Sequence, residues 1–597
     1  MGLMKVLPIF PEFPPSFWSY RYAVELVRKK ATMPPTGLAT VAAMFPKDRF
    51  DILPIADLNV KKLNDEDIKK ADMVMLSAMI AQRESTKEVI DKVHFYGKKI
   101  IAGGPYPTSY RDEISADYLV LDEAEVTLDP FLEDLLNDKP LRIYDSKSVK
   151  GRSLNTPLTK GGKPLITKTP VPRWDLLDLN NYSSLAVQYS RGCPFDCEFC
   201  DITALFGRES RTKTPEQMIE EVEAIRKTGW RGSIFIVDDN FIGKKDEVRK
   251  MLPVLTNWQK KNNYPFTFFT EASMDLAMPA NKDIREGMIK AGFDSVFTGI
   301  ESPDPDVLAK MKKRQNAGYT TPAEKVKILQ ESGFEVMGGF IIGADGEKPN
   351  VFENMFEFIQ ETGVVIPMAG LLTALRNTAL HKRLELEGRL ISDTTGNNTH
   401  NLSFNFKTQL DEKFLLDGYS DLLGKLFDSK NFYARCRVQE SIRGPHHKLS
   451  RTDSDGFYAF ARLFYENIIK HPDKEFAKYL LEVAVTHPSN IPEAVAQAAK
   501  LRHFKIMTEN TFAVVDYQKK THSLYEDFRA KVEELRDGAN DRWDKVSEME
   551  KRVLEKARKG YEKIHEDFRK DAKKHKEILI NRISEFKRSL YPNQNAV

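Results

Sequence analysis

The sequence predicts an α/β protein with an N-terminal doubly wound parallel sheet, a partial (βα)6 barrel and a C-terminal helical region. Three observations indicate this fold class. Short apolar segments alternate with amphipathic segments five times in residues 1–140, the alternation recurs six times in residues 183–390, and the strand pattern then fades. Such alternation is typical of parallel sheets, and a chain of 597 residues is too long for a single hydrophobic core.

Residues 1–140 predict an open sheet that binds its ligand at the carboxyl ends of the strands. Helical stretches such as Ser85–Tyr96 and Leu128–Leu136 separate the strands. Residues 141–182 contain scattered Pro, Gly, Lys and Thr without a sustained period, which predicts a linker that packs on the surface. The predicted strands are Lys5–Ile9, Phe50–Ile55, Met73–Ser77, Lys99–Ala102 and Tyr118–Leu121.

Residues 183–390 predict six strand–helix units in series. Six such units favour an incomplete barrel over a second open sheet, although the pattern is compatible with both. In a barrel, the residues that carry the chemistry are expected at the carboxyl ends of the strands. The predicted strands are Ala186–Tyr189, Ser233–Val237, Phe266–Thr270, Ser295–Gly299, Val336–Ile342 and Val364–Leu371. The predicted helices are Pro215–Lys227, Asp246–Lys261, Lys282–Ala291, Thr321–Glu331, Val351–Thr362 and Thr378–Glu387.

The remaining chain predicts helices. Residues 391–515 are expected to form a mainly helical domain. Residues 516–597 combine Lys and Glu with apolar residues at helical spacing, which predicts a charged helical hairpin or short coiled coil and not an arm that binds nucleic acid. Gly538–Asn540 is the expected hairpin turn, and His446 and His447 are expected in a polar loop.

The composition narrows the class of protein. A net charge of +3 predicts no strong attraction to nucleic acid. The N-terminal residues lack the features of a signal peptide, and no apolar stretch approaches the ~18 residues of a membrane helix. Four cysteines are too few for a disulfide scaffold, and three of them fall close together, which predicts a metal site in a reducing cytoplasm.

The clustered cysteines are Cys193, Cys197 and Cys200, in CxxxCxxC spacing directly after the first predicted barrel strand. Zinc sites usually pair cysteines as CxxC with a second pair further along, whereas Cys436 is distant and isolated. Three thiolates in a tight loop suit three irons of a [4Fe–4S] cluster with its fourth iron open. A structural zinc site or three buried thiols remain the alternatives.

This motif, with aromatic Phe199 before the last cysteine, resembles that of the radical S-adenosylmethionine (SAM) superfamily. The resemblance implies that SAM chelates the open iron and is cleaved by one electron to a 5′-deoxyadenosyl radical. It also implies SAM contacts near the barrel strand ends. An acceptor for the SAM ammonium is expected at Asp238 or Asp239, although a helix N-cap explains one of them equally well. The other expected SAM contacts are Phe199, Glu271, Ser273, Glu301 and Gly343.

The front sheet resembles the cobalamin-binding domain that precedes many radical SAM barrels. The resemblance is based on the segments Leu76–Met79, Ala102–Pro107 and Asp122–Glu125. Glycines let backbone lie against a large ring because no Cβ intrudes. The only histidine of this domain, His94, lies in a predicted helix, so cobalamin is expected without a histidine ligand. A sheet that has lost its cofactor is the alternative. The implied cobalamin contacts are Ser77, Met79, Gly103, Gly104, Pro105 and Glu123.

Longer segments resemble the hopanoid C-2 methylase group of cobalamin-dependent radical SAM enzymes, over residues 1 to about 440. They include Phe13–Ser19, Ser77–Ser85, Pro172–Leu177 and Thr270–Ser273. The resemblance implies methylation of an unactivated carbon of a hydrophobic or lipid substrate and an electron-donor protein. The expected location is the cytoplasm, as the clustered cysteines indicate, with a peripheral position at the inner face of the membrane as the alternative. The resemblance assigns no catalytic residue.

Three other functions were weighed against carbon methylation. A radical cyclase or rearrangement enzyme would transfer no methyl group. A methylthiotransferase would need a second cysteine trio, which the sequence lacks. A non-catalytic redox or cofactor-sensing protein is the third. The aromatic residues Phe17, Trp18 and Trp174 suit a hydrophobic substrate, but core packing explains them nearly as well.

Overall fold

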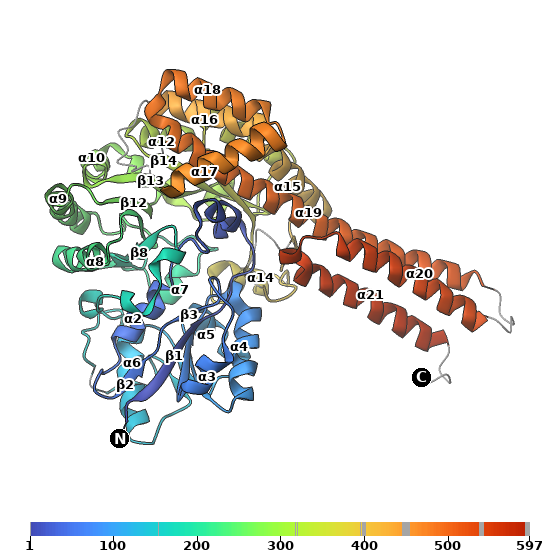
Figure 1. The fold of residues 1–597 in the computed structure, drawn as a ribbon, viewed down its shortest axis with the longest axis horizontal. Helices are drawn as coiled ribbons and strands as arrows, with labels where there is room; N and C mark the ends of the chain where they lie inside the picture. Colours follow the sequence, from blue (N-terminus) through green and yellow to red (C-terminus); the bar gives the residue numbers. More distant parts are fainter. Residues whose placement is uncertain are drawn as a thin grey trace. The chain divides into compact units, whose positions relative to one another are not determined.

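The computed structural model describes residues 2–152, 154–316, 318, 320–394, 396, 402–443, 454–535 and 542–590. The chain divides into two units, Met1–His503 and Phe504–Val597, and Figure 1 labels their helices and strands. Among the described residues, no helix is both long and apolar enough to cross a membrane.

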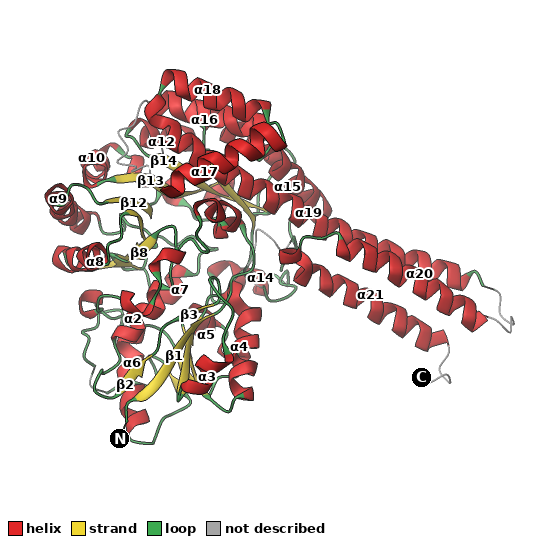
Figure 2. Ribbon diagram, in the orientation of Figure 1, coloured by secondary structure: helices red, strands yellow, loops and turns green. Residues whose placement is uncertain are grey.

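The first unit begins with a parallel sheet in the order β2-β1-β4-β5-β6-β7, with β3 also paired to β1. Helices cover both faces of this sheet (Figure 2), so it is doubly wound, as predicted. One apolar core contains residues of α2 and α6, and the other contains residues of α3 and α4. The strands are β1 (Met4–Phe10), β2 (Phe50–Ile52), β3 (Ala56–Asp57), β4 (Met73–Ser77), β5 (Lys99–Gly103), β6 (Tyr118–Val120) and β7 (Ile143–Tyr144). The main helices are α2 (Thr36–Ala43), α3 (Asp65–Lys70), α4 (Arg83–Phe95), α5 (Pro105–Ser109) and α6 (Ala124–Leu136).

Two short strands were not predicted. The strand predicted at Phe50–Ile55 ends at Ile52 as β2, and β3 follows at Ala56–Asp57, beyond the predicted end. Strand β7 lies in the expected surface linker, pairs with β6 and contains the fully buried Tyr144. Ile166 and Trp174 of the same segment are also buried. A strand of two residues is too short to show a period of two, so only its pairing reveals it.

Six parallel strands follow in the order β8-β11-β12-β13-β14-β15, with β8 and β15 at the edges of the sheet. Each predicted strand and helix of this region is present within a few residues, which confirms the (βα)6 pattern. Thr214 and Thr321 form capping boxes with Gln217 and Glu324, which explains why α8 and α12 begin where they do. The strands are β8 (Leu185–Val187), β11 (Gly232–Ile236), β12 (Phe266–Glu271), β13 (Phe293–Glu301), β14 (Glu335–Ile342) and β15 (Ile366–Leu371). The helices are α8 (Pro215–Lys227), α9 (Lys245–Lys261), α10 (Lys282–Ala291), α12 (Pro322–Glu331), α13 (Val351–Thr362) and α14 (Ala379–Leu386).

The C-terminal part of the first unit is helical, and α15 and α16 pack against barrel helices α12 and α13. It comprises α15 (Glu412–Leu426), α16 (Ser429–Arg443), α17 (Ser454–Phe464), the π-helix η11 (Tyr465–Lys470), α18 (Lys474–Thr486) and the start of α19 (Ile491–Glu533).

The second unit contains the later part of α19, together with α20 (Arg542–Glu562) and α21 (Arg569–Leu590). Phe528, Val546 and Ile583 belong to a core to which all three helices contribute, so this extension has a third helix beside the two of the expected hairpin. The predicted turn at Gly538–Asn540 and the expected loop at His446 and His447 lie outside the described residues.

Candidate cofactor-binding site

The three clustered cysteines lie in the loop between β9 (Ser190–Arg191) and α7 (Ile202–Phe206). Strand β9 pairs with β10 (Arg211–Thr212), which closes the loop at its base. Glu198 fixes the middle of the loop, because its backbone N–H donates to the Met311 carbonyl at 3.1 Å and its carboxylate pairs with Arg383 of α14 at 2.7 Å. The loop is therefore held from both sides of the barrel mouth.

Side-chain amide groups lie beside two of the thiols. Gln315 Nε2 donates to Cys197 Sγ at 3.3 Å, and Asn240 Nδ2 lies 3.9 Å from Cys193 Sγ. Burial raises the pKa of the Cys200 thiol, and the Lys313 ammonium opposes that rise. Amide donors and a cation beside thiolate sulfur are features that tune iron–sulfur clusters.

The donor set therefore suits the three irons of a [4Fe–4S] cluster. In the part of the chain that the structure describes, no three His, Cys, Asp or Glu side chains are arranged to hold a metal ion as they stand. The assignment of a [4Fe–4S] cluster to this loop therefore depends on the three thiols and their polar neighbours. It does not depend on a set of ligands already arranged around a metal position.

The two candidate aspartates follow β11 and have different partners. Asp238 is 1% exposed and accepts hydrogen bonds from the backbone N–H groups of Tyr189 and Ser190, each at 2.8 Å, and from Ser190 Oγ at 2.7 Å. It therefore fixes the start of the cysteine loop. Asp239 accepts one hydrogen bond from the Gly192 N–H at 2.7 Å through Oδ2. The geometry leaves Asp239 better able than Asp238 to receive a cationic ligand.

The carboxylate of Glu271, at the end of β12, has no hydrogen bond or ion pair within the described residues, and the residue is partly buried. Burial raises the pKa of Glu271 and of Asp238 to about 7, and that of Asp239 to about 6. The nearby Asp239 carboxylate adds to the rise at Glu271. A cation bound among these carboxylates would restore their charged forms, so the cluster suits the positive groups of SAM.

Asn240 connects the cysteine loop to β12, although the sequence analysis assigned it no role. Its Oδ1 accepts from the Ser273 backbone N–H at 3.1 Å and from Ser273 Oγ at 3.2 Å, while its Nδ2 faces Cys193. Ser273 Oγ is also within hydrogen-bond distance of Asp275, and its single proton is donated to one acceptor or the other. Asn240 directly follows the two candidate aspartates in the sequence, and that position was an available signal.

Glu301 ends β13 with a φ of 65° and pairs with Lys313, whose Nζ lies 2.7 Å from Oε1. The pairing of β13 with β14 shifts register between Gly299 and Glu301. Asn316 Nδ2 donates to the carbonyls of Gly299 and Ile300 at 2.9 and 2.8 Å and so stabilises this irregular end of β13. A Cβ on Gly299 would collide with the Glu301 carboxylate and lie 2.7 Å from Lys313 Nζ. Lys313 was not predicted, since nothing in its local sequence shows that it reaches Glu301.

Phe199 and Gly343, the remaining residues expected to contact SAM, have different surroundings. Lys313 Nζ is 5.7 Å from the centre of the Phe199 ring. Gly343 has a φ of 94°, donates its N–H to Glu347 at 2.9 Å, and leaves no room for a Cβ beside the Phe404 ring. Packing against Phe404 therefore explains this glycine without a ligand.

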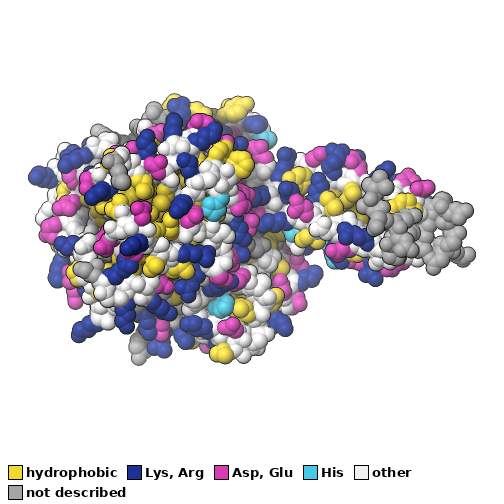
Figure 3. Space-filling view, turned by 90° about the horizontal axis from the view of Figure 1, so that it is seen from below, with side chains coloured by type: hydrophobic (Ala, Val, Ile, Leu, Met, Phe, Trp, Pro, Cys, Tyr) yellow, Lys and Arg dark blue, Asp and Glu magenta, His cyan; other side chains and the backbone are white. Residues whose placement is uncertain are grey.

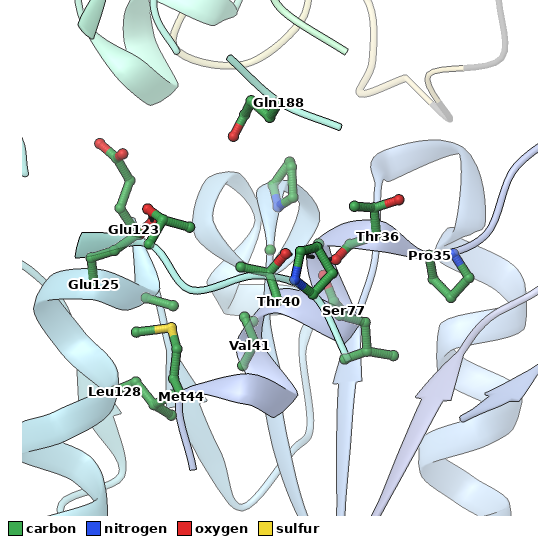
Figure 4. A pocket seen from close by; sticks show the side chains of 18 of the residues that line it. Pro35, Thr36, Thr40, Val41, Met44, Ser77, Glu123, Glu125, Leu128 and Gln188 are labelled. Carbon is green, nitrogen blue, oxygen red and sulfur yellow. Dashed lines mark hydrogen bonds between the residues drawn. The ribbon is translucent and has the colours of Figure 1, made fainter. Parts of the chain in front are cut away.

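A cavity of about 450 Å³ lies between the carboxyl edge of the front sheet and the first barrel strands. Figure 4 shows Gln188, from the barrel, facing Thr36, Thr40 and Ser77 of the front domain across this space. The volume is in the range of small-molecule and cofactor sites. All six predicted cobalamin residues line it: Ser77, Met79, Gly103, Gly104, Pro105 and Glu123.

The glycine rim of this cavity has no room for side chains. Gly104 has a φ of 92°, and a Cβ there would lie 2.6 Å from Ser77 Oγ. A Cβ on Gly103 would lie 2.8 Å from the Val120 carbonyl oxygen. No histidine of the described chain lines the cavity. The flat rim, the volume and the absence of a histidine fit a corrinoid held without a histidine ligand.

Glu123 does more than line the cavity. It precedes α6, and its Oε2 pairs with Arg191 at 2.7 Å and with Arg211 at 2.8 Å, while Oε1 is buried without a partner among the described atoms. Arg191 also pairs with Glu125 at 3.1 Å. Burial raises the pKa of Glu125, but Arg191 outweighs that effect and brings it to about 2. These four residues form an interdomain ion-pair network that ends two residues before Cys193.

Aromatic side chains lie on the inner face of the barrel. Phe235 and Phe269 stack at 4.7 Å between ring centroids, and Trp18 meets Phe297 edge-on at 5.2 Å. These three phenylalanines are only partly buried, whereas their strand neighbours are fully buried beneath the helices, so they lie on the opposite face. The fully buried strand neighbours are Ile234, Ile236, Phe268 and Val296.

The three aromatic residues that the sequence analysis considered together have different environments. Trp18 is 47% exposed, whereas Phe17 stacks on Phe427 at 5.7 Å and is buried. Trp174 is also buried. Core packing therefore accounts for Phe17 and Trp174, and Trp18 remains available to a ligand.

Comparison with family models assigns three regions of the chain. Residues 26–132 match the B12 binding domain, residues 187–359 match the radical SAM superfamily, and residues 378–515 match a domain of unknown function (DUF4070). The first two regions contain the cavity rim and the cysteine loop, respectively.

Curated relatives cover most of the chain. It is 40% identical over 436 residues to the uncharacterized methyltransferase sll1242 of Synechocystis sp. (strain ATCC 27184 / PCC 6803 / Kazusa), covering 72% of this chain and 78% of that protein. It is 33% identical over 393 residues to the hopanoid C-2 methylase of Rhodopseudomonas palustris (strain TIE-1), covering 65% and 71%.

A solved structure shows the same fold. It is that of the cobalamin-dependent S-adenosylmethionine radical enzyme OxsB with aqua-cobalamin and S-adenosylmethionine bound. The TM-score is 0.54 at 14% sequence identity, and the match covers 93% of this chain and 84% of that one.

Proposed function

Because the chain belongs to the cobalamin-dependent radical SAM methyltransferase family, we propose that it methylates an unactivated carbon of a hydrophobic, hopanoid-like lipid. Its two matched domains imply a [4Fe–4S] cluster, SAM and cobalamin as cofactors. The observation that carries the proposal is the 33% identity to a hopanoid C-2 methylase over 71% of that protein. Membership of a family of enzymes argues against the alternative of a non-catalytic redox or cofactor-sensing protein.

The residues of the chain have separate tasks in this proposal. Bound together, the cluster and SAM supply a 5′-deoxyadenosyl radical, and cobalamin supplies a methyl group. Cys193, Cys197 and Cys200 would hold the cluster. Asp239 and Glu271 would receive the positive and hydroxyl groups of SAM, since both carboxylates lie beside the loop with few partners of their own.

The front cavity would place the corrinoid close to the cysteine loop. Its rim at Gly103 and Gly104 supplies a flat backbone, and Gln188 and Arg191 close it from the barrel side. The interdomain ion-pair network would then keep the two cofactor sites in a constant relation. The largely apolar lining of this space would help to keep water away from a reactive intermediate once the cofactors fill it.

The aromatic inner face of the barrel supports a hydrophobic substrate. Trp18 is nearly half exposed over Phe297, and the stacked pair Phe235 and Phe269 lies on the same inner face. Partly exposed aromatic rings inside a barrel gain free energy when an apolar ligand covers them. Trp18 is the member of this set that comes from the front domain.

A peripheral membrane contact is proposed for delivery of the lipid, on the evidence of one helical surface. On α17, η11 and α18, several large apolar side chains are exposed, accompanied by Lys470, Lys474 and Lys478. Such a surface suits an anionic bilayer, and sedimentation with phosphatidylglycerol vesicles tests it. The exposed apolar residues are Phe457, Phe464, Tyr465, Ile469, Leu481 and Val485.

The proposed reaction is tested by anaerobic turnover with deuterated-methyl SAM and a polycyclic isoprenoid lipid. Methylation predicts both 5′-deoxyadenosine and S-adenosylhomocysteine, together with a labelled lipid. Trp18→Ala is expected to lower lipid turnover while leaving SAM cleavage without lipid nearly unchanged. Deoxyadenosine alone, beside an unlabelled product two hydrogens lighter, would establish the cyclase alternative instead.

A further inference from the structure

We propose that an acidic one-electron carrier protein docks on a basic rim beside the cysteine loop, formed by Lys310, Lys312 and Arg314. The inference rests on the proposed function, since it names the partner that would reduce the cluster held by that loop.

The segment that carries the rim touches the cysteine loop directly. It follows α11 (Pro305–Lys310) and leads into the short helix η10 (Arg314–Asn316). The Met311 carbonyl accepts the Glu198 N–H at 3.1 Å, and Gln315 Nε2 donates to Cys197 Sγ at 3.3 Å. A protein bound on this segment would therefore lie next to a cluster ligand.

Inward and outward side chains alternate along this segment. Met311 is 2% exposed and Lys313 9% exposed, and Lys313 pairs with Glu301 inside the site. Lys312, by contrast, is exposed and has a φ of 56°, in the left-handed region. The turn thus sends one lysine to the cofactor site and leaves its neighbours at the surface.

The three basic side chains of the rim are exposed and have no ion pair within the described part of the chain. Next to them, one lysine and one arginine face three carboxylates. Lys348 lies 3.7 Å from Asp304 and 3.9 Å from Asp306, and Arg383 pairs with Glu198. The three rim cations outnumber the one carboxylate that these pairs leave unmatched, so the net charge of this group of residues is positive.

This local excess contrasts with the rest of the molecule. The chain has 90 basic and 87 acidic residues, and both kinds are interspersed over the face shown in Figure 3. A basic rim at one site steers an acidic partner there and makes the encounter dependent on salt. On the other flank of the loop, Arg208 is largely exposed and lies 3.8 Å from Asp196.

The electron balance of the step is simple. One electron leaves the reduced carrier, which is oxidised by one electron, and enters the cluster, which is reduced by one. No bond is formed or broken, and no proton is transferred. A flavodoxin in its anionic hydroquinone form is a probe of this class, because it becomes the neutral semiquinone without exchanging a proton.

The test reverses the charge of the rim in the holoenzyme, with the double variant Lys312→Glu/Arg314→Glu. Flavodoxin binding is measured by calorimetry at low and high salt. Deoxyadenosine formation is measured separately with reduced flavodoxin and with dithionite, a small reductant that needs no docking surface. We expect flavodoxin affinity to fall by about tenfold or more at low salt, with a weaker salt dependence. The rate with dithionite should be unchanged.

The matched control is Lys260→Glu/Lys261→Glu. These exposed lysines end α9, at the end of the barrel opposite the strand carboxyl ends. This variant should bind flavodoxin like the wild type. Unchanged binding by the rim variant would overturn the proposal, as would equal losses with flavodoxin and dithionite, which would show that the rim acts on the cysteine loop itself. Absence of deoxyadenosine from the wild type with dithionite would contradict the proposed function, while the binding measurement would still decide the docking.

Discussion

At the scale of single residues, the glycines of the two sites are required by their surroundings. Gly104 combines a left-handed backbone with a close approach to Ser77, and Gly299 leaves the space that the Glu301–Lys313 pair occupies. A side chain at Gly104 would strain the backbone and displace Ser77, and a side chain at Gly299 would displace the Glu301–Lys313 pair. Gly37 also lines the front cavity, but a Cβ there would meet nothing within 4 Å. The two kinds of glycine look alike in the sequence.

Gly104→Leu should abolish cobalamin binding and leave the iron content unchanged, because the new side chain would occupy the rim and the cysteine loop is remote in sequence. Corrinoid absorbance after reconstitution and iron per chain measure the two effects. Gly37→Ala serves as the control and should retain cobalamin. If Gly104→Leu still binds a stoichiometric corrinoid, the rim is not the cobalamin surface.

At the scale of elements, the interdomain ion-pair network joins α6 of the front domain to β9 and β10 of the barrel. Arg191 and Arg211 stand on the two paired strands, and Glu123 bridges them from the residue that precedes α6. All three side chains are largely buried. A buried pair contributes little net stability while intact, but loss of one partner leaves the other charge uncompensated.

Glu123→Gln should therefore lower the free energy of unfolding by about 3–5 kcal/mol, as measured by urea denaturation. The control is Glu223→Gln, which removes a more exposed pair with Arg226 within α8 and should cost about 0–1 kcal/mol. Similar losses for the two variants would show that the network contributes no more than an ordinary surface pair.

The network also predicts a pH dependence. Arg191 holds the pKa of Glu125 at about 2, below its ordinary value of 4.5. A depressed carboxylate pKa contributes stability that is present above the unfolded value and is lost as pH falls through the folded one. Its contribution should therefore disappear between about pH 4.5 and pH 2, and not near neutrality.

At the scale of the whole molecule, the two cofactor sites are built on different sheets. The cysteine loop follows the first barrel strand, whereas the glycine rim of the front cavity, proposed for cobalamin, lies on β4 and β5 of the front sheet. Each site has its own supporting contacts, and the cavity and the ion-pair network connect them. Loss of one cofactor should therefore leave the other site able to bind.

Replacement of Cys193, Cys197 and Cys200 by Ala together should abolish iron binding and SAM cleavage but preserve cobalamin binding. Metal analysis, deoxyadenosine assays and corrinoid absorbance distinguish these outcomes. Anaerobically reconstituted wild type should contain about four irons per chain. Stoichiometric zinc without iron in that preparation would contradict the radical SAM assignment.

The sequence by itself determined the two sheets, the order of the barrel units, the cysteine loop and the family, because these depend on local periodicity and on motifs of fixed spacing. Tertiary structure alone decided the partners of those residues. It paired Glu123 with Arg191, brought Lys313 to Glu301, placed Trp18 on Phe297 and buried Phe17 and Trp174. Each of these facts depends on contacts between segments remote in the chain, and a local pattern contains no information about which distant segment the folded chain brings near.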